Sequence, residues 1–364
     1  MKVIMAGGGT GGHIYPALAI AQGISKKWPK SEIIFVGTKN GIETTIIPET
    51  GLPLVLISAE GLNRSSMLKA LGSALKVPVG FWQARNIIKD FQPDLVIGTG
   101  GYVSYPVVLA ASIMGIKTVI HEQNAFPGLA NRALAKRVDC VMLTFQEAAK
   151  HLSGKKVVVT GLPVRPGIAD ADREEACDFF SFRRDIFTLV AFGGSRGAAS
   201  INRAMLGLVE KYRSQEVQII WVTGEQNYDK MVQAVGPQGV PENVRMYPYL
   251  FEMEKALAIA DLAICRAGAA TIAELAARGV PAILIPYPYA AENHQEKNAR
   301  ALERKGAAIT IVDEYLDSTT LFKKVEELRH NKFRLLRMGQ LMKEEGKPKA
   351  LENILAVIEE LSKK

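Results

Sequence analysis

The sequence contains little of what disulfide-bonded, metal-binding and membrane-spanning proteins require. Its three cysteines are far apart and form no Cys-x-x-Cys pair, so we expect no disulfide framework or zinc site and a reducing compartment. The five histidines show no metal-ligand spacing. No apolar run reaches the ~18 residues of a membrane span. The first residues, with one lysine and a short apolar stretch, do not fit a signal peptide.

The overall composition is typical of a folded protein with two domains. Hydrophobic residues make up 48% and charged residues 23% of 364 residues, a length that exceeds one ordinary core. The net charge of +8 suits an anionic partner such as a nucleotide, a phospholipid surface or nucleic acid. General solubility explains the same charge equally well, so composition leaves the partner open.

Short β-branched runs alternate with helical runs along the first half of the chain. This alternation predicts parallel strands with helices on both faces of the sheet. The expected strands are Lys2–Ala6, Glu32–Val36, Leu54–Ile57, Leu95–Gly98, Thr118–His121, Cys140–Leu143 and Val157–Thr160. Two prolines and a glycine within residues 161–166 then indicate a link to a second domain.

The second half repeats the order of strand, glycine loop and helix. A strand over Phe187–Phe192 precedes a glycine loop at 193–198 and a helix over Ser200–Val209, and the tail 347–364 has the apolar spacing of a closing helix. Further strands are expected at Val217–Val222, Val244–Tyr247, Leu262–Cys265, Ala282–Ile285 and Ala308–Ile311. The repeat predicts an α/β fold of two doubly wound domains facing a cleft, with ligands beyond the carboxyl ends of the strands.

The opening motif, GGGTGGH at residues 7–13, joins the first strand to a helix expected over Ile14–Ile24. Bare N–H groups at a helix N-terminus bind anions. A dinucleotide loop needs an acidic residue after the second strand, which ends FVGT at 35–38, and a Walker loop needs Gly-Lys-Ser/Thr. Both interpretations lose support, and a tight turn without ligand stays open. His13 can accept a proton near neutral pH or simply cap the loop.

Two further segments follow strands in the same half. Residues 98–104, GTGGYVS, form another glycine loop, and residues 121–124, HEQN, place four polar side chains after an apolar strand. Loops of this kind at one edge of a sheet favour a ligand with phosphate groups and hydroxyls. An ordinary polar loop is the alternative for 121–124.

The second half carries comparable signals at residues 265–275 and 286–298. Thr271 lies at the start of a helix, where its hydroxyl and nearby N–H groups suit a phosphate. Glu274 lies on the same face and can accept hydrogen bonds from ribose hydroxyls, although Thr271 and Glu274 also fit a capping box. Gln295 and Asn298 are three residues apart, so one helical face offers both amides to sugar hydroxyls.

Together these motifs resemble those of the MurG glycosyltransferases, which transfer N-acetylglucosamine (GlcNAc) from UDP-GlcNAc to undecaprenyl-pyrophosphoryl-MurNAc-pentapeptide (lipid I) and so make lipid II for peptidoglycan. The segments that carry the resemblance are GGGTGGHIYPALA (7–19), GTGGYVSYPVVLAA (98–111), HEQNAFPGLANR (121–132), GLPVR (161–165), FGGSRGAASIN (192–202), CRAGAATIAEL (265–275) and PYAAENHQEKNA (288–299). The resemblance implies the GT-B fold of two Rossmann-like domains. Residues 1–163 would bind the acceptor and face the membrane, residues 164–341 would bind the donor, and 342–364 would return to the first domain.

The resemblance also implies the residues that bind each substrate. The donor set is Thr10, Gly11, Gly12, Asn124, Arg165, Ser195, Leu250, Arg266, Ala269, Ala270, Thr271, Glu274, Gln295 and Asn298. Within it, Arg165, Ser195 and Thr271 would contact the diphosphate, and Glu274 the ribose. The pyrophosphate of lipid I would lie at Gly9, Thr10, Gly12, Gly100, Gly101 and Tyr102. Leu162 replaces the family's usual asparagine, so no polar role is expected there.

Residues 61–85 resemble the family's membrane-binding patch. Apolar residues alternate with cations in the set Met67, Leu68, Lys69, Leu75, Lys76, Phe81 and Trp82. This mixture suits an anionic lipid interface and implies a peripheral protein on the cytoplasmic face of the cell membrane, whereas a core-facing helix is the alternative. No tightly bound metal is expected, because no Asp-x-Asp stands in a plausible donor loop. No cofactor and no nucleic-acid partner are expected either. Partners among cell-wall synthesis proteins stay open.

The expected reaction is a single displacement that inverts the anomeric centre. The MurNAc 4-hydroxyl attacks as UDP leaves, His13 takes the proton, and helix N-termini with Arg165 or Arg266 stabilise the departing diphosphate. Two alternatives stay open: a UDP-GlcNAc 2-epimerase, which shares the fold and the donor, and a non-catalytic nucleotide-sugar binding protein.

Overall fold

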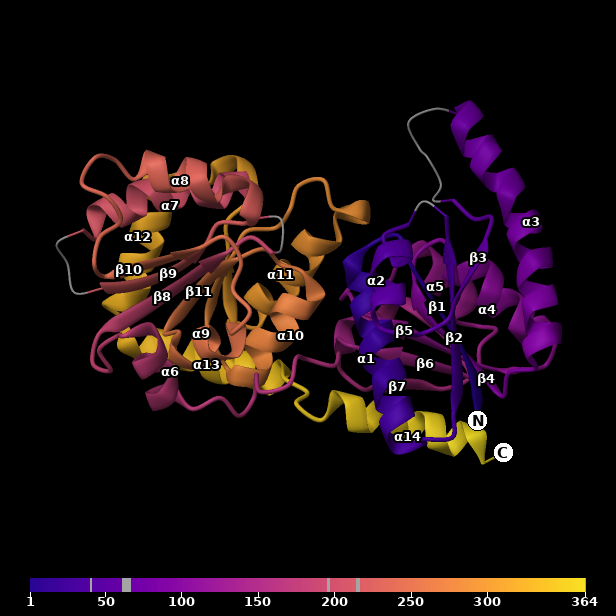
Figure 1. The fold of residues 1–364 in the computed structure, drawn as a ribbon. Coiled ribbons are helices and arrows are strands. Elements are labelled where there is room, and N and C mark those ends of the chain that lie inside the picture. Colours follow the sequence, from indigo (N-terminus) through magenta and orange to yellow (C-terminus); the bar gives the residue numbers. More distant parts are fainter. Residues whose placement is uncertain (40, 61–66, 195–196, 214–216, 364) are drawn as a thin grey trace. The chain divides into compact units, whose positions relative to one another are not determined.

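The computed structural model describes residues 1–39, 41–60, 67–194, 197–213 and 217–363, and for 67–77 it describes the main chain alone. The chain divides into two compact units, unit 1 (Met1–Pro163 with Lys349–Lys364) and unit 2 (Val164–Pro348). Each unit is built on its own parallel sheet (Figure 1). No helix in the described part of the chain is long and apolar enough to cross a membrane.

Unit 1 contains a seven-stranded sheet in the order β3-β2-β1-β4-β5-β6-β7, with every neighbouring pair parallel. Its elements are β1 (Lys2–Gly7), α1 (Gly11–Lys27), β2 (Glu32–Thr38), α2 (Glu43–Glu49), β3 (Leu54–Ile57), α3 (Met67–Phe91), β4 (Leu95–Gly100), α4 (Ser104–Ile113), β5 (Lys117–Glu122), α5 (Leu129–Leu134), β6 (Cys140–Leu143), η1 (Gln146–His151), β7 (Val157–Val159) and α14 (Ala350–Ser362).

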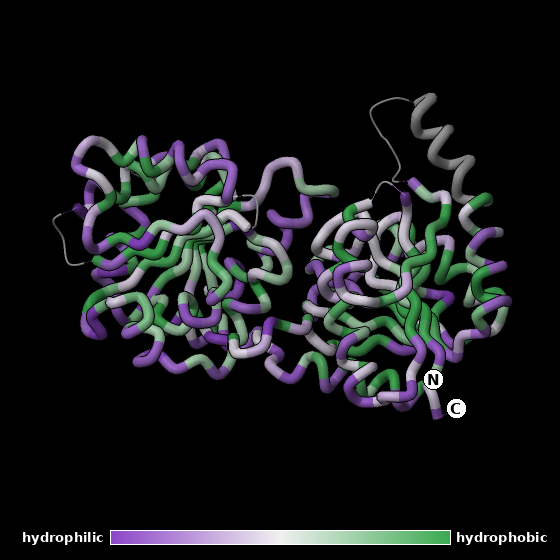
Figure 2. Tube along the Cα trace, viewed as in Figure 1, coloured by the Kyte–Doolittle hydropathy of each residue, from purple (hydrophilic) through white to green (hydrophobic). Residues whose placement is uncertain are grey.

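The unit 1 sheet buries both of its faces. Val3 and Met5 of β1 belong to a core shared with α1 and α14, whereas Ile4 and Ala6 belong to a second core shared with α3 and α4. Strands that are buried on both faces are continuously apolar, as Figure 2 shows along the sheet. Ile358 of α14 is fully buried in the first core, and α14 lies beside α1 (Figure 1). The predicted return of the C-terminal helix to the first half of the chain is therefore confirmed.

Unit 2 contains a six-stranded parallel sheet in the order β10-β9-β8-β11-β12-β13. Its elements are α6 (Arg173–Phe180), β8 (Phe187–Phe192), α7 (Ala199–Lys211), β9 (Val217–Val222), η2 (Glu225–Asn227), α8 (Tyr228–Ala234), β10 (Val244–Tyr247), α9 (Met253–Ile259), β11 (Leu262–Cys265), α10 (Ala269–Arg278), β12 (Ala282–Leu284), η3 (Ala291–Asn293), α11 (His294–Arg304), β13 (Ala308–Thr310), η4 (Asp313–Tyr315), α12 (Ser318–Arg329) and α13 (Lys332–Glu345).

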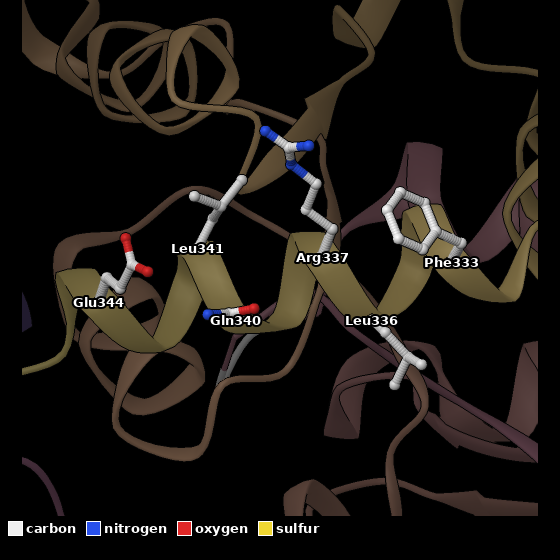
Figure 3. Close-up of a pocket in the computed structure, with 6 residues that line it drawn as sticks. All are labelled: Phe333, Leu336, Arg337, Gln340, Leu341 and Glu344. Carbon is white, nitrogen blue, oxygen red and sulfur yellow. The ribbon is translucent and has the colours of Figure 1, made fainter.

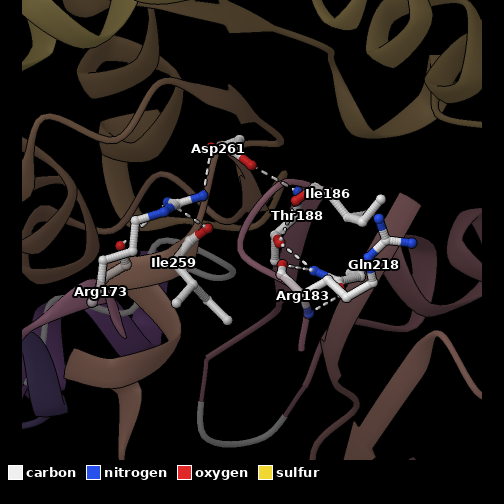
Figure 4. A network of polar contacts seen from close by, with 8 residues as sticks. Arg173, Arg183, Ile186, Thr188, Gln218, Ile259 and Asp261 are labelled. Carbon is white, nitrogen blue, oxygen red and sulfur yellow. Dashed lines mark hydrogen bonds and ion pairs between the residues drawn. The ribbon is translucent and has the colours of Figure 1, made fainter. Parts of the chain in front are cut away.

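A polar network ties together the amino ends of the unit 2 strands (Figure 4). Asp261, just before β11, accepts hydrogen bonds from Nη2 of Arg173 at 3.1 Å and from the Thr188 N–H at 2.8 Å. Gln218 of β9 donates to the Arg183 carbonyl oxygen at 3.0 Å. Burial raises the pKa of Asp261, and its two donors oppose that rise. These polar groups hydrogen-bond to one another at the edge of the sheet where the strands begin. The glycine loops follow the opposite ends of the strands.

All of the predicted strands are present, and the predicted doubly wound α/β class is confirmed. Strands β3, β6, β8, β9, β10 and β11 have the predicted bounds, and the other strands differ by one or two residues at an end. The first helix begins at Gly11 rather than at the predicted Ile14. The reason is Thr10, which has an extended backbone (φ −144°, ψ 153°) and serves as the N-cap. His13 therefore lies in the first turn of α1.

Candidate functional site

The glycine loops at residues 7–13 and 98–104 meet in unit 1. The strand order reverses between β1 and β4, the position where ligands bind in doubly wound sheets. A Cβ atom on Gly100 would lie 3.0 Å from Cδ2 of His13, and one on Gly101 would clash with the carbonyl oxygen of Gly8. Gly100 and Gly101 also have positive φ angles of 100° and 79°. Only glycine permits this backbone and this close approach.

The His13 ring is held against these loops. Its Nδ1 lies 3.2 Å from the carbonyl oxygen of Gly8 and 3.1 Å from Oγ1 of Thr10. Because a carbonyl oxygen only accepts, the Gly8 contact places a proton on Nδ1, so the lone pair of the neutral ring is on Nε2. Oγ1 of Thr99 donates to the His13 carbonyl oxygen at 2.8 Å. The ring therefore has the tautomer that a general base requires, and it also helps to hold the loop.

The residues expected to bind pyrophosphate divide into two kinds. Helix α1 begins without a side-chain cap, so its first turn, which includes Gly11 and Gly12, carries main-chain N–H groups of the kind that bind anions. The Gly9 N–H, in contrast, donates to Oε2 of Glu43 at 3.0 Å. Gly9 therefore shapes the loop through its backbone, with φ of 82°. No local pattern in the sequence pointed to Glu43.

The polar segment 121–124 is mostly internal. His121, Glu122 and Gln123 are buried, so the structural alternative holds for these three, and only Asn124 is partly exposed. Nε2 of His121 lies 2.8 Å from the Gly161 carbonyl oxygen. Burial lowers the pKa of His121 to about 4, against the opposing effect of that hydrogen bond. His121 is thus neutral and structural near pH 7.

Glu122 organises the loop that follows β5. Its carboxyl oxygens accept from the Asn124 N–H at 2.9 Å, the Gly128 N–H at 3.0 Å and Nδ2 of Asn131 at 2.8 Å. Burial raises the pKa of Glu122, and these hydrogen bonds act in the opposite direction. Glu122 therefore orients Asn124, the residue of this segment that remains able to contact a sugar.

In unit 2 the corresponding reversal of strand order lies between β8 and β11, and α10 begins just after β11. Gly268 is the N-cap of α10 and supplies no side chain, while Ala269 is partly exposed and Ala270 exposed. Thr271 is the third helical residue, not the cap, and Glu274 bonds to Arg165. The capping-box alternative is therefore wrong, and α10 begins with an uncapped turn suited to a phosphate.

Arg165 and Glu274, two residues expected at the donor, pair with each other. Nε of Arg165 lies 2.6 Å from Oε1 of Glu274, and Nη2 lies 2.8 Å from Oε2. The side chain of Arg165 is 43% exposed and that of Glu274 is 9% exposed. The hydrogen bonds to Glu274 raise the pKa of Arg165, against a smaller effect of burial. In this structure the Arg165 guanidinium and the Glu274 carboxylate bind each other. These are the same groups that are expected to bind the nucleotide.

Arg266 is also bound by protein groups. Its guanidinium donates to the Asp313 carboxylate, to Oγ of Ser200 at 3.0 Å and to the carbonyl oxygens of Ile285 and Pro286 at 3.2 and 3.1 Å. These bonds join the loops after β11 and β12 to the start of α7. The expected contact of Arg266 with a diphosphate requires that it give up at least one of these partners.

Gln295 and Asn298 lie on α11, one turn apart as predicted. Oε1 of Gln295 accepts from the Tyr287 N–H at 2.9 Å. Asn298 is fully buried and donates through Nδ2 to the Ala267 carbonyl oxygen at 3.2 Å. Both amides therefore shape the loops after β11 and β12, and Gln295, which is less buried, is the better placed to reach a sugar.

The remaining expected residues are less informative. Leu250, after β10, is buried, so it can contact a base mainly through its backbone. In the proposed membrane patch, Phe81 packs partly against a unit 1 core, whereas Trp82 is 59% exposed, with the Arg85 guanidinium 5.5 Å from its ring. Outside the described residues or side chains lie Ser195, Met67, Leu68, Lys69, Leu75 and Lys76.

Helix α13 carries a pocket that none of the expected site residues lines (Figure 3). It is lined by Phe333, Leu336, Arg337, Gln340, Leu341 and Glu344, which belong to this one helix. None of them was expected to bind a substrate. Across the described residues there is no cluster of three or more His, Cys, Asp or Glu side chains that could hold a metal ion.

Two parallel α/β units, each with glycine loops and an uncapped helix where its strand order reverses, fit the class of GT-B glycosyltransferases. Residues 3–143 match the N-terminal domain of glycosyltransferase family 28, and residues 188–354 match its C-terminal domain. The chain is 45% identical to the UDP-N-acetylglucosamine–N-acetylmuramyl-(pentapeptide) pyrophosphoryl-undecaprenol N-acetylglucosamine transferase of Desulforamulus reducens over 99% of both chains. It is 46% identical to the transferase of the same name from Moorella thermoacetica over 98% of both.

The structural comparison agrees with these relatives. Acinetobacter baumannii MurG has a TM-score of 0.82 and 27% identity, with 99% of both chains covered. A UDP-N-acetylglucosamine 2-epimerase from Listeria monocytogenes has a TM-score of 0.63 at 14% identity, with 98% of this chain and 95% of that chain covered, and shares the fold alone. The chain belongs to the MurG family of glycosyltransferases.

Proposed function

We propose that this protein transfers GlcNAc from UDP-GlcNAc to the MurNAc-pentapeptide of lipid I and so makes lipid II for peptidoglycan. The main support is the identity of 45–46% to transferases of that name over almost the whole of both chains. The glycine loops and uncapped helices of both units agree with two substrates that each carry a diphosphate.

The donor belongs to unit 2 in this proposal. The first turn of α10, with Thr271, receives the diphosphate, and Arg165 turns from Glu274 to the same phosphates. The Glu274 carboxylate is then able to accept two hydrogen bonds from the ribose hydroxyls. Donor binding therefore exchanges the Arg165–Glu274 bonds, at 2.6 and 2.8 Å, for bonds to the nucleotide.

The acceptor belongs to unit 1, with its pyrophosphate at the first turn of α1 and at the loop that contains Gly100, Gly101 and Tyr102. The oxygen of the MurNAc 4-hydroxyl forms a bond to the anomeric carbon of GlcNAc, and the bond from that carbon to the β-phosphate oxygen breaks. The bonding electrons leave with UDP, and the hydroxyl proton passes to Nε2 of His13. Attack opposite the leaving group inverts the α-linked donor to a β-1,4 product.

The lipid acceptor implies a peripheral position on the cytoplasmic face of the membrane. Trp82 is exposed beside Arg85 on α3, a combination of aromatic side chain and cation that suits an anionic lipid surface. Partners among other cell-wall synthesis proteins are compatible with that position.

One experiment separates this proposal from its alternatives. The protein is incubated with UDP-GlcNAc labelled with 13C at C1 and a short-chain lipid I analogue, and the products are followed by NMR. A β-linked disaccharide lipid formed together with UDP supports the proposal. N-acetylmannosamine formed without acceptor would identify an epimerase, and binding of UDP-GlcNAc without any product would identify a binding protein.

A further inference from the structure

Glu43 is a fully buried carboxylate that no expectation from the sequence included. It is the first residue of α2, in the loop region between β2 and β3. Its partners in the described part of the chain are main-chain and hydroxyl groups: the Gly9 N–H, the Thr38 N–H and the Thr38 hydroxyl. Burying a carboxylate is costly, so a side chain of this kind is expected where its hydrogen bonds fix a particular geometry.

Glycines line the space that the Glu43 side chain fills. A Cβ atom on Gly8 would lie 2.6 Å from Oε1 of Glu43, and a Cβ on Gly37 would lie 2.6 Å from its Cγ. A Cβ on Gly41 would clash with the carboxyl carbon itself. Gly8 belongs to the opening glycine motif, so one role of that motif is to make room for Glu43.

The carboxylate connects two loops that are far apart in the sequence. Oε2 accepts from the Gly9 N–H at 3.0 Å, and Oε1 accepts from the Thr38 N–H and Oγ1 at 2.9 Å each. Oγ1 of Thr38 in turn lies 3.2 Å from the hydroxyl of Tyr102, in the loop after β4. The Tyr102 ring lies against Gly9, whose Cβ would be 2.8 Å from Cε1. Glu43 therefore fixes the glycine loop at residues 7–13 relative to the one at residues 98–104.

We propose that Glu43 is a positioning residue that holds the first glycine loop in the conformation that receives the lipid-linked pyrophosphate, an inference that rests on the proposed function of that loop. A carboxylate repels an anion, so its benefit is geometric: it orders Gly9 and leaves the N–H groups of the first turn of α1 aimed at the acceptor. Replacing the charge while keeping the shape distinguishes these two effects.

The test compares Glu43→Gln with Glu49→Gln, a control at an exposed position of the same helix. Glutamine is isosteric but presents an NH2 group to one of the N–H donors. We expect kcat to fall by roughly 10- to 100-fold and the KM for a lipid I analogue to rise. The reason is that the free energy of a hydrogen bond to a charged group corresponds to about that factor. The Kd for UDP should stay within about twofold of wild type, because the nucleotide binds unit 2 in the proposed function.

Two further readouts keep the test independent of turnover and of folding. Amide hydrogen exchange in a peptide covering residues 6–13 should accelerate in Glu43→Gln and not in Glu49→Gln. Thr38→Ser retains the hydroxyl and should behave like wild type, whereas Thr38→Val should show part of the Glu43→Gln defect. The Thr38 pair provides the result if Glu43→Gln does not fold.

Three results would overturn the inference. These are unchanged exchange at residues 6–13, tighter binding of the lipid I analogue by Glu43→Gln, and an equal loss toward both substrates in proportion to the folded fraction. Failure of the proposed function would look different. In that case the wild-type protein itself would not transfer GlcNAc to lipid I, while the exchange experiment would still report on Glu43.

Discussion

The substitution Glu274→Gln tests whether the Arg165–Glu274 pair serves the donor or the fold. Glutamine keeps the size of the side chain but replaces one carboxylate oxygen with an NH2 group. It therefore loses one of the two bonds to Arg165 and the charge that would accept the ribose hydroxyls. We expect UDP to bind about 10- to 100-fold more weakly, since a hydrogen bond to a charged group contributes about 1.5–3 kcal/mol.

The same geometry predicts a small effect on the stability of unit 2. The Arg165 side chain is 43% exposed, so water screens the ion pair. Its contribution to the free energy of unfolding should be about 1 kcal/mol or less. A change of that size lowers Tm by about 2–4 °C in a unit of this length. A large loss of affinity with a small loss of stability is the expected combination.

Titration calorimetry with UDP and scanning calorimetry of the free protein measure these two quantities. Glu242→Gln, at an exposed position near the amino end of β10, is the matched control. UDP affinity within about twofold of wild type would refute the ribose role of Glu274. A fall in Tm of more than about 10 °C would show instead that the pair is chiefly structural.

Three further predictions concern unit 1. His13→Ala should lower kcat by about 100-fold or more while leaving the Kd for UDP unchanged, because a positioned base contributes that much; near-normal turnover would remove the base assignment. Since the folded pKa of His121, about 4, lies below its unfolded value of 6.5, stability should decline as pH falls from 6.5 to 4. That decline amounts to about 3 kcal/mol, and chemical denaturation should show it reduced in His121→Gln. Trp82→Ala should weaken binding to anionic vesicles by about 5- to 10-fold with unchanged Tm, as sedimentation with vesicles can measure; equal binding would exclude Trp82 from the interface.

The sequence predicted the strands and the positions of the glycine loops because both signals are local. A run such as Phe187–Phe192 is apolar throughout, and a strand buried on both faces requires that pattern. The start of α1 was predicted three residues late, because apolar periodicity begins only at Ile14 while the N-cap is set by the backbone of Thr10. Helix boundaries of this kind depend on backbone geometry that periodicity does not report.

The site was predicted less completely because its bonds join distant residues. Nothing local links Arg165 to Glu274, 109 residues later in the chain, or Glu43 to Gly9. In the segment 121–124, the polarity of the residues indicated a ligand, yet His121, Glu122 and Gln123 are buried inside unit 1, where their bonds include a His121–Gln123 contact and a bond from Asn131 to Glu122. Burial is a tertiary property, so the sequence could not separate Asn124 from its three buried neighbours.

The central claim is that this chain makes one molecule of lipid II for each molecule of UDP released. The most direct measurement quantifies both products from UDP-GlcNAc in the presence and absence of a lipid I analogue. We predict that UDP release depends on the acceptor and equals the amount of GlcNAc recovered in the lipid product. UDP release that proceeds at the same rate without acceptor, or GlcNAc that never enters the lipid, would contradict the account.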